Sequence, residues 1–171
     1  MKPPVHRALQ QIFFAFLLLI TSQAAVAAVS IFLNIPGIPG ESVDAAHIDE
    51  IDILSWGQSA SNVNTGPVLL PLTVSKYTDK ASPLLTQHVL EGTRIPEMWI
   101  IVRSAGLVPL EYLTVKLCDA NVISIKTGGS AADARLKETV TFSAVGYRMT
   151  YTPLRPDGSP DIPISYSYGG C

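Results

Sequence analysis

V-S-I-F-L-N-I-P-G-I-P-G-E-S is the sequence from Val29 to Ser42, and this stretch decides the fold. Its first half is apolar and predicts a short strand, while its second half alternates proline with glycine. Because proline fixes φ and glycine permits positive φ, Pro36-Gly37 and Pro39-Gly40 predict two close turns before Glu41-Ser42. A strand that leads into so specific a turn indicates a fold with a fixed topology.

The residues before this stretch have the plan of a secretory signal peptide. A basic start is followed by the apolar run Ile12–Ile20 and by a small-x-small cleavage site at Ala25-Val26-Ala27. The run is too short for a membrane-spanning helix, although an uncleaved membrane anchor is the alternative interpretation. We predict that residues 1–27 are a signal peptide and that residues 28–171 form one domain, exported to the periplasm or secreted. No second long apolar run follows, so we expect no stable membrane insertion after cleavage.

The charge of the chain excludes nucleic acid as a partner. The formal net charge is −2, and charged residues make up 15% of the sequence, below the usual share of about a quarter. Removal of the predicted signal peptide also removes two basic residues, and the remaining chain has no basic run. Low charge also fits a surface that neighbouring subunits partly cover.

The chain has two cysteines, Cys118 and Cys171. Export would place both in an oxidising compartment, where they could form one disulfide within the chain. A free buried thiol at Cys118, or a bond between two chains, remains an alternative, because sequence does not show whether the cysteines approach each other. No Cys-x-x-Cys motif occurs, so we expect neither a zinc site nor a redox site.

The domain is predicted to be mainly β, with one short helix. Ser82 is expected to cap the helix, Pro83 suits its first position, and Gly92 can close it. The apolar face of this helix consists of Ala81, Leu84, Leu85, His88 and Val89. The expected later strands are Ile48–Trp56, Val68–Val74, Met98–Arg103, Tyr112–Ile125, Thr139–Tyr151 and Ile162–Tyr168.

Two long strands change the phase of their alternation, which predicts irregularities. In Tyr112–Ile125, Asp119 and Asn121 interrupt an inward face that we expect to include Ile123, and this predicts a bend or bulge. In Thr139–Tyr151, the apolar positions change from even to odd, which predicts a β-bulge near Ala144–Gly146. Gly57–Pro67 is polar and rich in turn formers, so it predicts a long exposed loop. These patterns together indicate a small barrel or sandwich.

No catalytic, metal or cofactor site is predicted. His47 and His88 are not spaced as a metal-binding pair, and a half-buried structural role is the favoured interpretation of His88. Ser130 lies in a Gly/Ala-rich loop and not in a nucleophile elbow. The acidic cluster between Asp44 and Asp52 favours a solvated entrance to a strand over a metal or acid/base site, because its spacing matches no known loop.

The order of these segments resembles the haemolysin-coregulated proteins, the Hcp tube subunits of type VI secretion. The opening strand followed by Gly37-x-x-Gly40-Glu41-Ser42 is similar to the opening of that family. The similarity continues through I-D-I-L-S-W-G at Ile51–Gly57, through Lys76–Arg103, and into the two long strands. It covers Ser30 to Tyr151.

This resemblance implies a tight β-barrel of two sheets with one flanking short helix. It also implies a structural protein and not an enzyme, forming homohexameric rings that stack into a tube and can carry effectors. The Gly57–Pro67 segment would occupy the place of the family's ring-stacking loop, with the helix toward the ring interior. The residues of that loop singled out for stacking are Gly57, Gln58, Ser59, Asn62 and Asn64.

The predicted signal peptide departs from the family, whose members are made in the cytoplasm without a cleaved signal. Two hypotheses accommodate it. In the first, a tube-type subunit assembles in the periplasm or outside the cell. Its partners would then include effectors or other secretion-apparatus proteins. In the second, an exported binding module has kept only the fold. An exported hydrolase is a third hypothesis, for which the sequence offers no positive feature.

Overall fold

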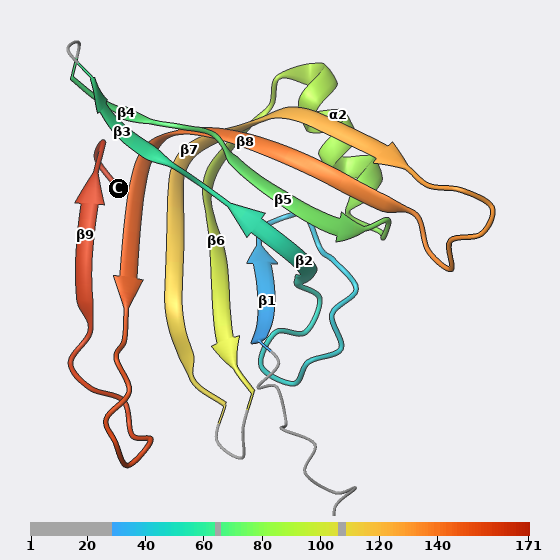
Figure 1. Ribbon diagram of the computed structural model, residues 1–171. Helices are drawn as coiled ribbons and strands as arrows, with labels where there is room; N and C mark the ends of the chain where they lie inside the picture. The colour runs from blue at the N-terminus through green and yellow to red at the C-terminus, as the bar shows by residue number, and fades with distance from the viewer. Residues whose placement is uncertain (1–28, 64–65, 106–108) are drawn as a thin grey trace, which may run out of the picture.

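The computed structural model describes residues 29–63, 66–105 and 109–171 (Figure 1). The predicted signal peptide lies outside the described residues. The elements are β1 (Val29–Asn34), β2 (Ile51–Gly57), β3 (Ala60–Val63), β4 (Gly66–Leu69), β5 (Leu72–Tyr77), α2 (Ser82–Glu91), β6 (Arg94–Ser104), β7 (Glu111–Gly128), β8 (Lys137–Tyr151) and β9 (Ile164–Tyr168).

Six strands close into an antiparallel barrel. The main sheet has the order β5-β2-β1-β6-β7-β8-β9, and β5 also pairs with the first half of β8. This second pairing joins the two ends of the six-stranded part, while β9 pairs with the second half of β8. The short helix α2 lies against β7. The predicted mainly β barrel with one short helix is therefore confirmed.

The inward face of the barrel is apolar, and β7 changes face at Asp119. Val115 and Leu117 are buried before this residue, and Ala120 and Val122 are buried after it. Asp119 has a φ of 53°, a left-handed conformation that breaks the two-residue alternation of a strand. The predicted irregularity is confirmed there, but Ile123, predicted to face inward, is 48% exposed. The prediction for Ile123 was wrong because it kept one parity along the whole strand.

The predicted β-bulge near Ala144–Gly146 was also wrong. The pairing of β7 with β8 keeps the same register from Cys118↔Gly146 to Ala120↔Ala144. The register shifts instead between Val122 and Ser124. Side chains of β8 do change face, because Tyr147 and Met149 pack against the core beyond Phe142. Since β7 changes face opposite the same point of β8, no extra residue is needed.

The helix begins differently from the prediction. Its N-cap position is Ala81, without a side-chain cap, and Ser82 is the first helical residue. The Ser82 hydroxyl is engaged elsewhere, in a buried hydrogen bond to Glu138. Gly92 closes the helix as predicted, with a φ of 65°. His88 is half-buried and its Nδ1 lies 2.9 Å from the Leu84 carbonyl oxygen, which confirms the structural interpretation of this histidine.

A buried charged network joins β5, α2 and β8. Lys76 is fully buried, and its three ammonium donors have three partners: Asp79 at 2.7 Å, Glu138 at 2.9 Å and Ser82 at 3.0 Å. Glu138 is also buried. Burial acts to raise the pKa of Glu138, but the hydrogen bonds from Ser82 and Lys76 and the charge of Lys76 hold this pKa below its usual value. The carboxylate therefore stays ionised beside the lysine.

Replacing Lys76 by methionine should destabilise the barrel by about 3–5 kcal/mol, because Glu138 is then a buried charge without its counter-ion. Chemical denaturation followed by circular dichroism measures this change. Lys80→Met is the matched control, since the pair of Lys80 with Asp49 is largely exposed and should contribute at most about 1 kcal/mol. Equal effects of the two substitutions would contradict the role given to the network.

Candidate functional site

The Pro/Gly turn after β1 is shaped by two different uses of glycine. Gly37 has a φ of 87°, which favours glycine, and the amide of Ile38 donates to the Ile35 carbonyl at 3.0 Å to close the first turn. The prediction of a second turn at Pro39-Gly40 was wrong, because this segment runs beside Asp49 and Glu50 and does not turn. Gly40 is required there because a Cβ on it would lie 2.3 Å from the Glu50 carbonyl oxygen. The second glycine thus permits close contact between two backbone segments.

Glu41 and Ser42 connect this turn to the rest of the barrel. The Gly40 amide donates to Asp49, and the Ser42 amide donates to the Glu50 carbonyl at 3.0 Å. The Glu41 carboxylate accepts the backbone N–H of Lys80, just before α2, at 3.1 Å. Ser42 is buried. The motif therefore positions the entrance to β2 and reaches the start of the helix, which is a structural role.

Gly40→Ala should destabilise the protein by about 1–3 kcal/mol, because the added methyl group forces two backbone segments apart. Gly57→Ala is the control, since nothing lies within 4 Å of a Cβ added there. The midpoint of urea unfolding measures both effects. If Gly40→Ala unfolds at the same urea concentration as the parent chain, the close packing of this turn does not contribute to stability.

Of the acidic residues that follow the turn, Asp44 and Glu50 are partly buried and paired, whereas Asp49 and Asp52 are exposed, so the predicted solvated entrance is confirmed only in part. Both terminal nitrogens of the Arg103 guanidinium, Nη1 and Nη2, donate to the carboxylate of Asp44. The hydrogen bond from Arg103 lowers the pKa of Asp44 to about 2. His47 is buried, stacked on Phe32 at 4.0 Å, with its Nδ1 3.0 Å from Glu50. Among the described residues, no group of His, Cys, Asp or Glu is placed to hold a metal ion.

The segment Gly57–Pro67 is a hairpin, where the sequence predicted a loop. β3 and β4 pair from Ala60↔Leu69 to Val63↔Gly66 and form a separate two-stranded sheet. This hairpin projects beyond the barrel, close to the end of β9 (Figure 1). Small polar residues predicted a loop, but they also suit a hairpin with both faces in contact with solvent or a partner.

The five residues expected to stack rings lie partly before the hairpin and partly within it. Gly57 ends β2, and Gln58 and Ser59 connect it to β3, where the Ser59 carbonyl accepts the Leu70 amide at 2.9 Å. Asn62 lies in β3 opposite Pro67. Asn64 lies outside the described residues.

A groove of about 580 Å³ separates the hairpin from the second half of β8 and from β9. One side presents Val68 and Leu69 from the hairpin. The other side presents Trp56 and an aromatic and sulfur-bearing group of residues. This group consists of Tyr147, Met149, Tyr166 and Tyr168. None of the described residues that line the groove is charged. Burial raises the pKa of the Tyr147 hydroxyl above its usual value.

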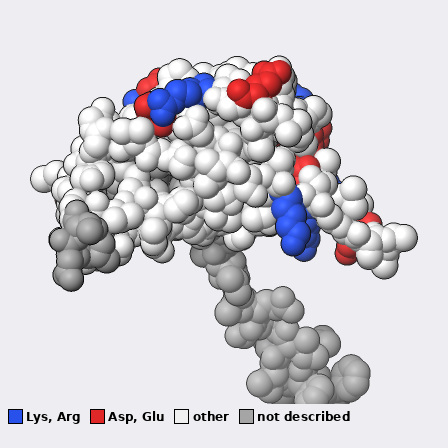
Figure 2. Space-filling model, turned by 90° about the horizontal axis from the view of Figure 1, so that it is seen from above, with Lys and Arg blue, Asp and Glu red and all other residues white. Residues whose placement is uncertain are grey.

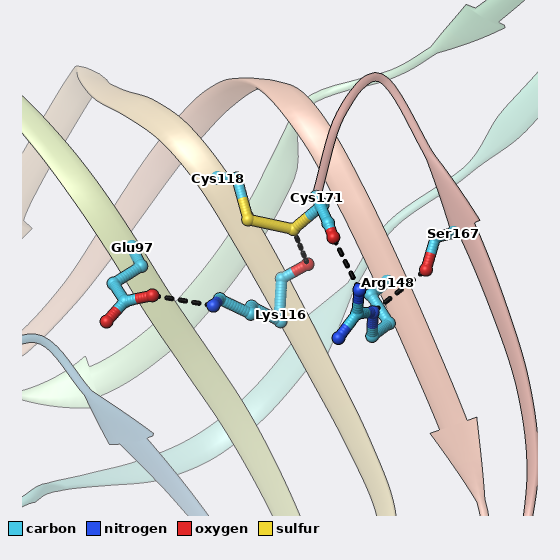
Figure 3. The surroundings of a disulfide bond; sticks show 6 residues. All are labelled: Glu97, Lys116, Cys118, Arg148, Ser167 and Cys171. Atoms are coloured by element: carbon cyan, nitrogen blue, oxygen red, sulfur yellow. Dashed lines mark hydrogen bonds and ion pairs between the residues drawn. A yellow bond between two sulfur atoms is a disulfide. The ribbon is translucent and has the colours of Figure 1, made fainter.

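Cys118 and Cys171 form a disulfide that fastens the end of the chain to β7 (Figure 3). The bond closes a loop with a sequence separation of 53 residues. A loop of this length stabilises the folded chain by about 4 kcal/mol in the chain-entropy description. Cys171 therefore belongs to the folded domain, and not to a free tail.

Charge is sparse on the face seen in Figure 2. Lys, Arg, Asp and Glu gather in a few groups, and most of this face is uncharged. Large apolar side chains are also exposed, among them Leu90 at 81% and Tyr166 at 67%. Scattered exposed apolar side chains are common on protein surfaces, so the groove lining carries more information about contacts than these residues do.

These features define a class: a closed antiparallel barrel whose polar clusters serve structure and whose hairpin and groove offer contact surfaces. Comparison with known proteins agrees. The family described as "Type VI secretion system effector, Hcp" matches residues 32–151. Protein hcp1 of Pseudomonas aeruginosa is 35% identical over 153 residues, covering 82% of this chain and 94% of the relative.

Solved structures agree as well. The crystal structure of Hcp1 from Salmonella typhimurium has a TM-score of 0.70 and 34% identity, covering 81% of this chain and 94% of that chain. A type VI secretion system effector from Yersinia pestis has a TM-score of 0.69 and 32% identity, covering 81% and 98%. The chain belongs to the Hcp family of type VI secretion. It is an Hcp-like tube protein, and the family is one of structural secretion-system proteins.

The family assignment confirms the resemblance based on the opening turn and on the order of segments. In the part of the chain that the structure describes, none of the helices has the length and apolar character needed to cross a membrane.

Sequence reasoning missed the buried network of Lys76 and Glu138. A signal for it was present, because Lys76 has the parity of Leu72 and Val74, and Glu138 has that of Val140 and Phe142.

Proposed function

We propose that this chain assembles with itself into hexameric rings that stack into a tube. The observation that carries the proposal is the β3–β4 hairpin, which forms its own sheet and projects from a barrel that is otherwise closed. Within the described residues, its pairing partners are confined to the hairpin itself. An isolated two-stranded hairpin is marginally stable in water, so contacts with another subunit would supply the stability it lacks.

The groove beneath the hairpin supports the same proposal. Its described lining is mostly aromatic and apolar, with a few uncharged polar side chains and no charged one. Interface centres are depleted in charge and enriched in Tyr, Trp and Met, all of which occur here. In a ring of this kind, α2 faces the interior, and the pore carries effector proteins.

Light scattering and negative-stain microscopy of the purified chain should show rings of about six subunits. Val68→Lys, on the hairpin wall of the groove, should weaken this assembly without changing the thermal unfolding temperature, because it places a charge in an apolar contact. Val43→Lys is the matched control, at a valine that is 95% exposed and outside the groove. A strict monomer at high concentration contradicts the proposal.

The groove also favours a second function, that of an exported binding module. Concave, mostly apolar sites with a few polar groups are typical of small-molecule pockets, and this groove adds Gln58 and Asn62 to its aromatic lining. A monomer whose unfolding temperature rises on adding a ligand would favour this function over the tube.

We further propose that residues 1–27 direct export and are removed. The proposal rests on the apolar run Ile12–Ile20 and on the cleavage site Ala25-Val26-Ala27. Intact-mass measurement of protein from the periplasm or medium should give a chain that begins at Ala28. Ala27→Tyr should block cleavage, whereas Ala15→Leu, within the apolar run, should not. A full-length chain that stays in the cytoplasm would contradict this proposal.

A further inference from the structure

The last twenty residues of the chain lie beyond the part that the family model matches. The family match ends at Tyr151, and the chain continues through a connection and β9 to Cys171. All five residues of β9 are exposed, and the strand pairs with β8 on one side. Its side-chain bonds are exposed as well, including Arg148 to Ser167 at 2.8 Å and Thr150 to Ser165 at 2.8 Å. Exposed hydrogen bonds contribute little net stability, so such a strand opens easily.

The backbone around Cys171 is shaped to bring this residue across β8. Gly169 and Gly170 have φ values of 68° and 81°, and a Cβ on Gly169 would lie 2.0 Å from the Val145 carbonyl oxygen. On β8, a Cβ at Gly146 would lie 3.0 Å from the Cβ atoms of both cysteines. The disulfide therefore passes over a point where β8 has no side chain.

Further contacts hold the terminal residue in this position. The Arg148 guanidinium donates to the Cys171 carbonyl oxygen at 2.6 Å, and the same side chain reaches Ser167 on β9 (Figure 3). Arg148 therefore joins the terminal residue to the strand. Because the disulfide is the covalent part of this arrangement, it controls how firmly β9 is held.

The outer edge of β9 is suited to pairing with another strand. Its sequence, I-S-Y-S-Y, contains no charge, no proline and no glycine. Native proteins usually protect an edge strand with such residues, because an unprotected edge is a template for another strand. Although the pairing of β5 with β8 closes the barrel, β9 lies outside this closure, and its outer side is an open edge of the main sheet.

We propose that the Cys118–Cys171 disulfide is required for self-assembly. It holds β9 in place, and a second copy of the chain pairs with the open edge of this strand. This inference rests on the self-assembly proposed above. Oxidation forms the Sγ–Sγ bond as two thiols lose two protons and two electrons to an external disulfide oxidant, which leaves as two thiols. A chain in a reducing compartment stays unassembled, and assembly begins after oxidation. The device couples ring formation to the compartment in which disulfides form.

The test compares the oxidised chain with two forms that lack the bond. One is the full chain reduced with dithiothreitol and blocked with iodoacetamide, and the other is the Cys118→Ser/Cys171→Ser variant. Light scattering at matched concentration should show rings for the oxidised chain and at least a tenfold weaker association for the other two. Circular dichroism establishes that the barrel stays folded, and hydrogen exchange should show loss of protection at β9.

A second variant keeps the disulfide and changes only the edge. Ile164→Lys places a charge on β9 and should weaken assembly of the oxidised chain at least tenfold. Ile162→Lys is the matched control, because this residue is 77% exposed and lies just before the strand. This variant tests whether the β9 edge is needed for assembly even if removal of the disulfide unfolds the barrel.

The outcomes separate the two proposals. Rings that form equally well with and without the bond, or with Ile164→Lys, overturn the role of the disulfide or of the β9 edge and leave the proposed tube function standing. An oxidised parent chain that remains monomeric at every concentration overturns both.

Discussion

The ion pair between Lys76 and Glu138 lies at the seam that closes the barrel. These residues face each other across the β5–β8 pairing, the contact that converts an open sheet into a closed one. Ser82 and Asp79 bring the start of α2 into the same network. A buried pair of this kind is costly to desolvate and stabilises only when every donor and acceptor is satisfied. The network therefore restricts β5, β8 and the helix to one mutual arrangement.

The Pro/Gly turn makes a second restriction near the same end of β5, through the connection that leads to α2. Gly40 allows the turn to pack against Glu50 at the entrance to β2, and Glu41 reaches the backbone of Lys80. The turn and the buried network therefore both make contacts with the connection between β5 and α2. Most polar side chains that sequence alone marks as chemically interesting are used in such contacts. This explains why a chain with acidic clusters and histidines belongs to a structural family.

The closed barrel leaves few places for contact with other molecules, and these places lie together. The hairpin, the second half of β8 and β9 are neighbours, and residues of all three line the aromatic groove. The disulfide fixes β9 against β8 and so fixes one wall of that groove.

The sequence by itself determined the local features: the turn at Pro36-Gly37, the closure of α2 at Gly92 and the irregularity at Asp119. Each depends on residues near one another in the chain, so composition and spacing suffice. The order of the segments along the chain indicated the family. Tertiary structure decided the rest. Ser82 turns from a cap into a partner of Glu138 because β8 brings a carboxylate to it. The Gly57–Pro67 segment forms a hairpin, and Cys171 meets Cys118, because pairing between distant strands sets positions that local sequence does not encode.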